Sequence, residues 1–147
     1  SMRNRQLTIF LFLLGIFSLH AQEWQTDYNL ASQEASEKNR PIILVFQGSD
    51  WCAPCIKLDR EVFQTEAFQL YAKDHFVMLE ANFPRKKKNA LPKEQQEKNK
   101  ALAEKYNPNG IFPFVVVLNS QGEVLGETGY MKTSPSQYIS HLESFKG

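Results

Sequence analysis

A chain of 147 residues is long enough for one domain with a buried core and short for two. Its formal net charge of +1 gives no overall basic excess, so the composition offers no argument for nucleic-acid binding. Two cysteines are too few for a disulfide-rich scaffold.

The N-terminal segment has the pattern of a secretory signal peptide. Arg3 and Arg5 precede an apolar run over residues 7–19, and the small residue Ala21 follows. A run of 13 residues is shorter than the roughly 20 that a membrane-spanning helix needs. We therefore expect cleavage near Ala21, with an uncleaved membrane anchor as the alternative.

Cleavage there gives a signal peptide over residues 1–21 and a single domain over residues 22–147. Ser1, which stands before Met2, is interpreted as an addition to the natural start. The mature domain is expected to be exported, to the periplasm or outside the cell, where cysteines usually form structural disulfides. Both cysteines lie in one C-x-x-C, so their role has to be explained locally.

The first half of the mature domain predicts alternating helices and strands. Apolar side chains over residues 28–35 favour an amphipathic helix that ends before Pro41. The continuous apolar run 42–46 predicts a strand covered on both faces. Pro54 suits the first turn of a second helix, because a proline needs no partner for an N–H there.

A further helix over residues 65–71 and an apolar strand over residues 75–82 come next, and strand, helix, strand suggests parallel pairing. Residues 84–100 then become rich in Lys, Asn, Gln and Glu. We expect an exposed polar insertion that leads into a helix over residues 94–106. Its basic quartet, residues 85–88, is interpreted as a solvated loop, with a docking patch for an acidic partner as the alternative.

The C-terminal part predicts a hairpin and a last helix. Strands over residues 114–118 and 123–128 are joined by a short turn, which implies antiparallel pairing. Pro135 opens a helix whose apolar side chains recur at helical spacing. The element order predicts an α/β fold, a mixed central sheet with helices on both faces.

Trp-Cys-Ala-Pro-Cys at residues 51–55, after a buried strand, and Pro113 before the hairpin resemble the thioredoxin superfamily. The resemblance covers most of residues 27–146 and implies the thioredoxin fold. Three stretches are most similar to the C-terminal domain of periplasmic thiol:disulfide interchange reductases and to small secreted thioredoxin-like proteins: residues 79–82, 110–113 and 129–131.

Cys52 and Cys55 carry the predicted chemistry. Disulfide exchange needs an attacking thiolate and a second thiol that resolves the mixed disulfide. At a helix start, free N–H groups and the helix dipole lower a thiol pKa, so we expect Cys52 to be an exposed nucleophile and Cys55 a more buried resolving thiol. Two alternatives are an inert local disulfide and a zinc half-site, for which the chain offers only His20, His75 and His141.

The resemblance implies a substrate groove around the cysteines. Pro113 corresponds to the family's cis-proline, which lies against the cysteines and leaves the backbone before it free to pair with an extended substrate. Phe112 is bulky; narrowing of substrate choice and an ordinary core role both stay open. The expected substrate-binding residues are Trp51, Ala53, Pro54, Phe112, Pro113 and Gly129.

Proton handling is where the sequence departs from the family. Many thioredoxins carry a buried acid six residues before the first cysteine, and Phe46 stands at that position here. Asp59 follows Cys55 by four residues and lies on the same helical face if the helix continues. The resembled reductase domains also carry an acid there. We expect Asp59 to act as a catalytic base for Cys55, with a solvated surface acid as the alternative.

These observations predict an enzyme, an exported thiol-disulfide oxidoreductase that reduces or isomerises protein disulfides. No cofactor is expected beyond the redox-active Cys52–Cys55 pair. No histidine lies between the cysteines to favour a strong oxidant. Expected partners are protein thiols or disulfides of the cell envelope and a membrane-embedded electron donor, with no nucleic acid, and the protein is expected to be a monomer. The alternatives are a holdase-like binding module with non-essential thiols and a reductase specialised for one client.

Overall fold

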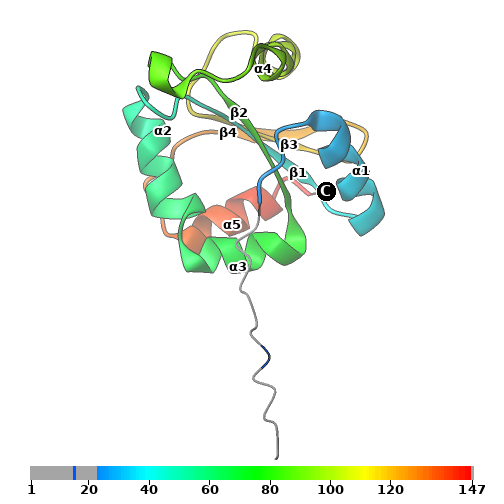
Figure 1. The fold of residues 1–147 in the computed structure, drawn as a ribbon. Coiled ribbons are helices and arrows are strands. Elements are labelled where there is room, and N and C mark those ends of the chain that lie inside the picture. Colours follow the sequence, from blue (N-terminus) through cyan, green and yellow to red (C-terminus); the bar gives the residue numbers. More distant parts are fainter. Residues whose placement is uncertain (1–14, 16–22, 147) are drawn as a thin grey trace, which may run out of the picture.

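The computed structural model describes Gly15 and residues 23–146 (Figure 1). The predicted signal peptide, residues 1–21, therefore lies outside the described residues except for Gly15. Among the residues that are described, no helix has the length and apolar character needed to cross a bilayer.

A four-stranded mixed sheet forms the centre of the domain, with the strand order β2-β1-β3-β4. The strands are β1 (Ile42–Gln47), β2 (Val77–Asn82), β3 (Phe114–Leu118) and β4 (Val124–Thr128). The central strand β1 pairs in parallel with β2 and antiparallel with β3, and β3 pairs antiparallel with β4. The predicted parallel pairing of β1 with β2 and the predicted antiparallel hairpin of β3 and β4 are confirmed.

Helices cover both faces of this sheet, as predicted (Figure 1). They are α1 (Tyr28–Lys38), α2 (Ala53–Leu58), α3 (Glu66–His75), α4 (Lys93–Tyr106) and α5 (Pro135–Glu143), with a π-helical turn η1 (Asp59–Phe63) and a 3-10 turn η2 (Lys87–Asn89). The predicted strand start at His75 is wrong. The N–H of Phe76 still donates to the carbonyl of Ala72, at 3.0 Å, so α3 reaches His75 and β2 begins at Val77.

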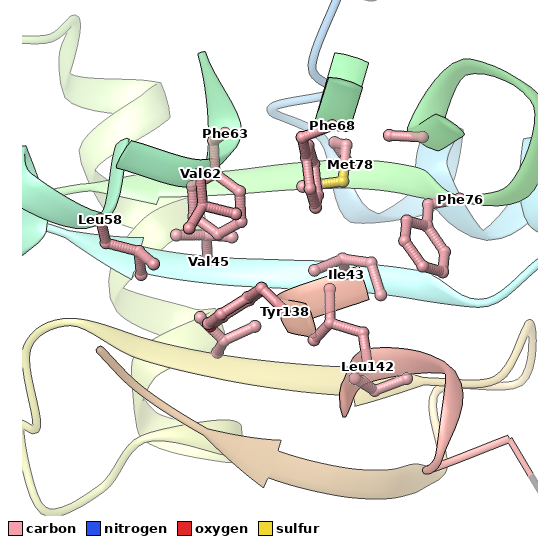
Figure 2. Packing of buried hydrophobic residues seen from close by; sticks show 13 residues of the cluster. Ile43, Val45, Leu58, Val62, Phe63, Phe68, Phe76, Met78, Tyr138 and Leu142 are labelled. Atoms are coloured by element: carbon pink, nitrogen blue, oxygen red, sulfur yellow. The ribbon is translucent and has the colours of Figure 1, made fainter. Parts of the chain in front are cut away.

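Alternation of side chains along β1 explains its continuous apolar sequence. Ile43 and Val45 point into a core shared with α3 and α5, where Figure 2 shows Val45 beside Phe63 and Ile43 on the side of Phe76. Leu44 points to the opposite face, into a core shared with α1 and α4. A strand covered on both faces needs apolar residues at every position. The C-terminal end of β1 is thereby fixed, and the chain leaves it towards α2.

Candidate active site

Cys52 and Cys55 lie where β1 leads into α2. A disulfide joins them, with their Cα atoms 5.2 Å apart. Cys52 is the N-cap of α2, and its Sγ accepts the backbone N–H of Cys55 at 3.3 Å. The Cys52 carbonyl accepts the N–H of Ile56 at 3.0 Å, so the first turn of the helix holds both ends of the pair. A sulfur that accepts a helix N–H is favoured in its thiolate form.

Both cysteines are buried in this disulfide-bonded state. The exposed fraction is 4% for Cys52 and 2% for Cys55, so the expectation of an exposed Cys52 is wrong here. The physical reason is that the Cys52 Sγ is turned inward, onto the Cys55 N–H and the Cys55 sulfur. Ala53 and Pro54, which separate the cysteines, are exposed and form the surface above them.

The loop before the cysteines packs through Trp51. Its ring contacts Phe112 edge to face, with the centroids 5.5 Å apart, and its Nε1 donates to the carbonyl of Phe83 at 2.7 Å. The loop closes on Gly48, whose carbonyl accepts the Cys52 N–H at 2.9 Å. A Cβ at Gly48 would overlap the Trp51 ring, so this packing requires a glycine.

Pro113 directly follows Phe112, the residue that the Trp51 ring contacts. The Phe112-Pro113 peptide bond is cis, as the resemblance implied. A Cβ at Gly129 would come within 3.3 Å of the Pro113 carbonyl oxygen, so Gly129 packs directly against this segment. The Tyr138 hydroxyl donates to the Gly129 carbonyl at 2.9 Å and holds that segment in place. The structure thus links four predicted groove residues by contact: Trp51, Phe112, Pro113 and Gly129.

Asp59 begins the π-helical turn one turn beyond Cys55. Its N–H donates to the carbonyl of Cys55, four residues earlier, so the helix continues as far as Asp59, the condition on which the prediction for Asp59 rested. The Asp59 carbonyl then accepts the N–H of Gln64, five residues further on, at 2.8 Å, which makes the following turn π-helical. The Asp59 carboxylate accepts Nε2 of Gln64 at 3.1 Å. Its role as a base for Cys55 stays a prediction.

Glu80 is a half-buried acid that the sequence analysis missed. It lies on β2 and accepts a hydrogen bond from Nε2 of Gln47, at the end of β1. Burial raises the pKa of Glu80, the Gln47 hydrogen bond opposes that effect, and the negative charge of Asp59 adds to it. An acid inside an otherwise apolar strand was the available signal. Phe46, at the family's acid position, is fully buried in the other core.

Asp50 ties the segment after β2 to this site. Its carboxylate accepts the backbone N–H groups of Arg85 at 2.9 Å and Lys86 at 3.0 Å, and Nδ2 of Asn89 at 3.0 Å. Hydrogen bonds lower the pKa of Asp50 to about 2; the bond from the Arg85 backbone N–H has the largest effect, and the bond from the Asn89 side chain the next largest. The Arg85 guanidinium lies 3.6 Å from the centroid of the Trp51 ring. The basic quartet, residues 85–88, is exposed, as expected of a solvated loop, and Asp50 and Trp51 anchor its first residues next to Cys52.

The histidines considered as zinc ligands have other neighbours. His75 stacks on Tyr71 with the ring centroids 4.0 Å apart, and Nε2 of His141 lies 2.9 Å from the Thr128 hydroxyl. His20 lies outside the described residues. In the described part of the chain, no group of three or more His, Cys, Asp and Glu side chains is placed to hold a metal ion.

Comparison with known proteins identifies similar chains. Residues 23–120 match the profile of a family described as Thioredoxin-like. The disulfide bond reductase DsbH of Chlamydia pneumoniae is 34% identical over 122 residues, 83% of this chain and 71% of DsbH. A solved structure of a DsbH oxidoreductase has a TM-score of 0.78 and 31% identity, covering 99% of this chain and 94% of that one. The oxidised C-terminal domain of Neisseria meningitidis DsbD shares the fold, with a TM-score of 0.54, 18% identity and coverage of 79% and 90%.

Proposed function

Because this chain belongs to the thioredoxin-like family and is a thiol-disulfide oxidoreductase with the C-x-x-C pair Cys52–Cys55, homologous to a disulfide bond reductase, we propose that it reduces or isomerises disulfides of exported proteins. The observation that carries this proposal is the position of Cys52 as N-cap of α2, with its sulfur on the Cys55 N–H. That contact favours the thiolate once the disulfide opens.

The proposed reduction begins with the dithiol form. The Cys52 thiolate attacks one sulfur of the substrate disulfide, and the other substrate sulfur leaves as a thiolate. Cys55 then loses its proton and attacks the Cys52 sulfur, which releases the second substrate thiolate and forms the Cys52–Cys55 disulfide. The substrate disulfide gains two electrons, and the enzyme pair loses two. Isomerisation follows when a substrate thiol displaces Cys52 before Cys55 reacts.

Asp59 is proposed to accept the Cys55 proton, directly or through water. Its backbone N–H on the Cys55 carbonyl sets it one helical turn from the thiol, and its carboxylate has Gln64 as a side-chain donor. Glu80 adds a second acid whose raised pKa brings its proton exchange closer to neutral pH. The negative charge of Asp59 contributes to the raised pKa of Glu80.

Export is part of the proposal. Its support is the N-terminal pattern of two arginines, an apolar run and a small residue. An exported reductase needs electrons from across the membrane, so the proposed donor is a membrane-embedded dithiol protein. The proposed substrates are disulfides of proteins in the cell envelope.

Trapping tests this function directly. A Cys55→Ser variant, expressed with its full N-terminus in its own cells, is expected to accumulate mixed disulfides with exported proteins, and Cys52→Ser is the matched control that should trap none. Purified Cys52→Ser should also lose insulin reduction. Unchanged suppression of aggregation by Cys52→Ser, with no trapped clients for Cys55→Ser, would contradict the proposal. A reduction potential close to that of a strong oxidant, about −120 mV, would reverse the proposed direction of electron flow.

A further inference from the structure

We propose that a basic groove beside the cysteine pair binds an acidic stretch of the polypeptide substrate, next to the disulfide that is exchanged. The basic groove is the hollow of about 620 Å³ between the segment after β2 and the first turns of α4. The inference rests on the proposed function, because it names the class of substrate that the Cys52–Cys55 pair serves.

The basic groove is continuous with the site. A second hollow, of about 610 Å³, is lined by Trp51 and Phe112, and it shares Phe83, Pro84 and Arg85 with the basic groove. Trp51 is the residue directly before Cys52. A substrate chain that reaches the cysteines along Trp51 can therefore extend over Arg85 into the basic groove.

Charge indicates what this groove binds. Five cationic side chains line it, against the single acid Glu97: Arg85, Lys86, Lys87, Lys93 and Lys100. The ion pairs found within residues 23–146 engage Lys38, Lys98 and Lys146 instead. The whole chain has a net charge of only +1, so this concentration of positive charge is local. An acidic segment would supply the carboxylates for ion pairs with these cations.

The walls of the basic groove are held in place before any substrate arrives. Asp50 fixes Arg85 and Lys86 through their backbone N–H groups. On the α4 side, Nδ2 of the buried Asn99 donates to the Asn82 carbonyl at 2.9 Å. A preformed groove loses little conformational entropy when it binds a chain, so weak charge contacts can contribute to affinity.

The lining also has an apolar part. Phe83, Ala90 and Leu91 contribute to it beside the lysines. The occupant that fits is therefore a peptide segment with two or more Asp or Glu residues and an apolar side chain among them. A free small anion would use the charge but leave this apolar surface in water.

The test compares two disulfide-bonded peptides with the same cysteine-containing centre and either acidic or neutral flanks. The reduced full-length enzyme is expected to show a kcat/KM about three- to tenfold higher for the acidic peptide, mostly through KM. This preference should fade as the salt concentration rises from about 0.05 to about 0.5 M. Lys87→Gln/Lys93→Gln should remove most of it.

Lys73→Gln/Lys146→Gln is the matched control, with the same loss of charge, and should keep the preference. The Arg40 guanidinium donates to the Lys73 carbonyl at 2.8 Å, and Lys146 lines a hollow with Arg40 and Pro41, so both lie at the end of β1 opposite the cysteines.

Equal kcat/KM for both peptides at low salt would overturn the inference, and so would a preference that Lys87→Gln/Lys93→Gln retains. Binding to anionic lipid vesicles without any peptide preference would assign the groove to a membrane surface and overturn it too. Failure to reduce either peptide would count against the proposed function itself, whereas equal reduction of both removes only the groove.

Discussion

Gln47 donates a hydrogen bond to Glu80 across the parallel pair of β1 and β2. This contact joins the end of the strand that leads to Cys52 with the half-buried acid of the neighbouring strand. Because the Asp59 charge raises the pKa of Glu80, the acid is also coupled electrostatically to the turn that follows Cys55. Glu80 thereby connects the pairing of β1 and β2 with the turn that carries the proposed base, Asp59.

Glu80→Gln should make the protein more stable at alkaline pH. The pKa of Glu80 is raised in the folded state, so the fold favours the protonated carboxyl over the carboxylate. The contribution of the protonated carboxyl to the free energy of unfolding is full below the unfolded pKa, about 4.3, and is lost as pH rises through the folded pKa. Gln stays neutral and keeps an oxygen for Gln47. Urea unfolding at several pH values should give a stability gain at pH 8 that vanishes towards pH 4, whereas exposed Glu104→Gln should give none. A loss that grows with pH would contradict this.

Asp59→Asn should slow the resolution of the mixed disulfide while leaving its formation unchanged. Removal of the proposed base is expected to lower the resolving rate by roughly tenfold to a hundredfold near neutral pH, since general-base contributions are of this order or larger. Stopped-flow mixing of the reduced variant with a disulfide peptide separates the two steps. Identical resolving rates for parent and variant across the pH range would remove Asp59 from the mechanism.

Asp50→Ala should release the segment that follows β2. The Arg85 and Lys86 N–H groups lose their acceptor, so their amide hydrogen exchange should become faster. In the parent, the lowered pKa of Asp50 means that its contribution is present above the unfolded pKa, about 3.9, and is lost as pH falls through about 2. Asp74→Ala, an exposed change on α3, is the control. Unchanged protection of both amides in Asp50→Ala would refute the tether.

The sequence was sufficient to predict the presence and order of the strands and α-helices because their signals are local. The apolar run of β1 and Pro54 at the start of α2 each indicate an element without knowledge of the rest of the chain. The contacts that complete the site are not local. Gln47 meets Glu80 only through the register of β1 and β2, and Asp50 meets Arg85 across 35 residues. Such pairs depend on the assembled sheet, so single-sequence patterns did not reveal them.

Gly48→Ala should disturb the site through Trp51. The added Cβ overlaps the indole, which is held by the Phe83 carbonyl and by Phe112, so the ring has to move. Overpacking of this kind destabilises by about 1–3 kcal/mol, and the displaced ring should lower disulfide-reducing activity as well. A double-mutant cycle gives the measurement, because the same glycine change made in a Trp51→Ala background meets no ring and should cost much less. Equal losses of unfolding free energy in the two backgrounds would mean that Gly48 is required for another reason, and that the Trp51 packing does not depend on it.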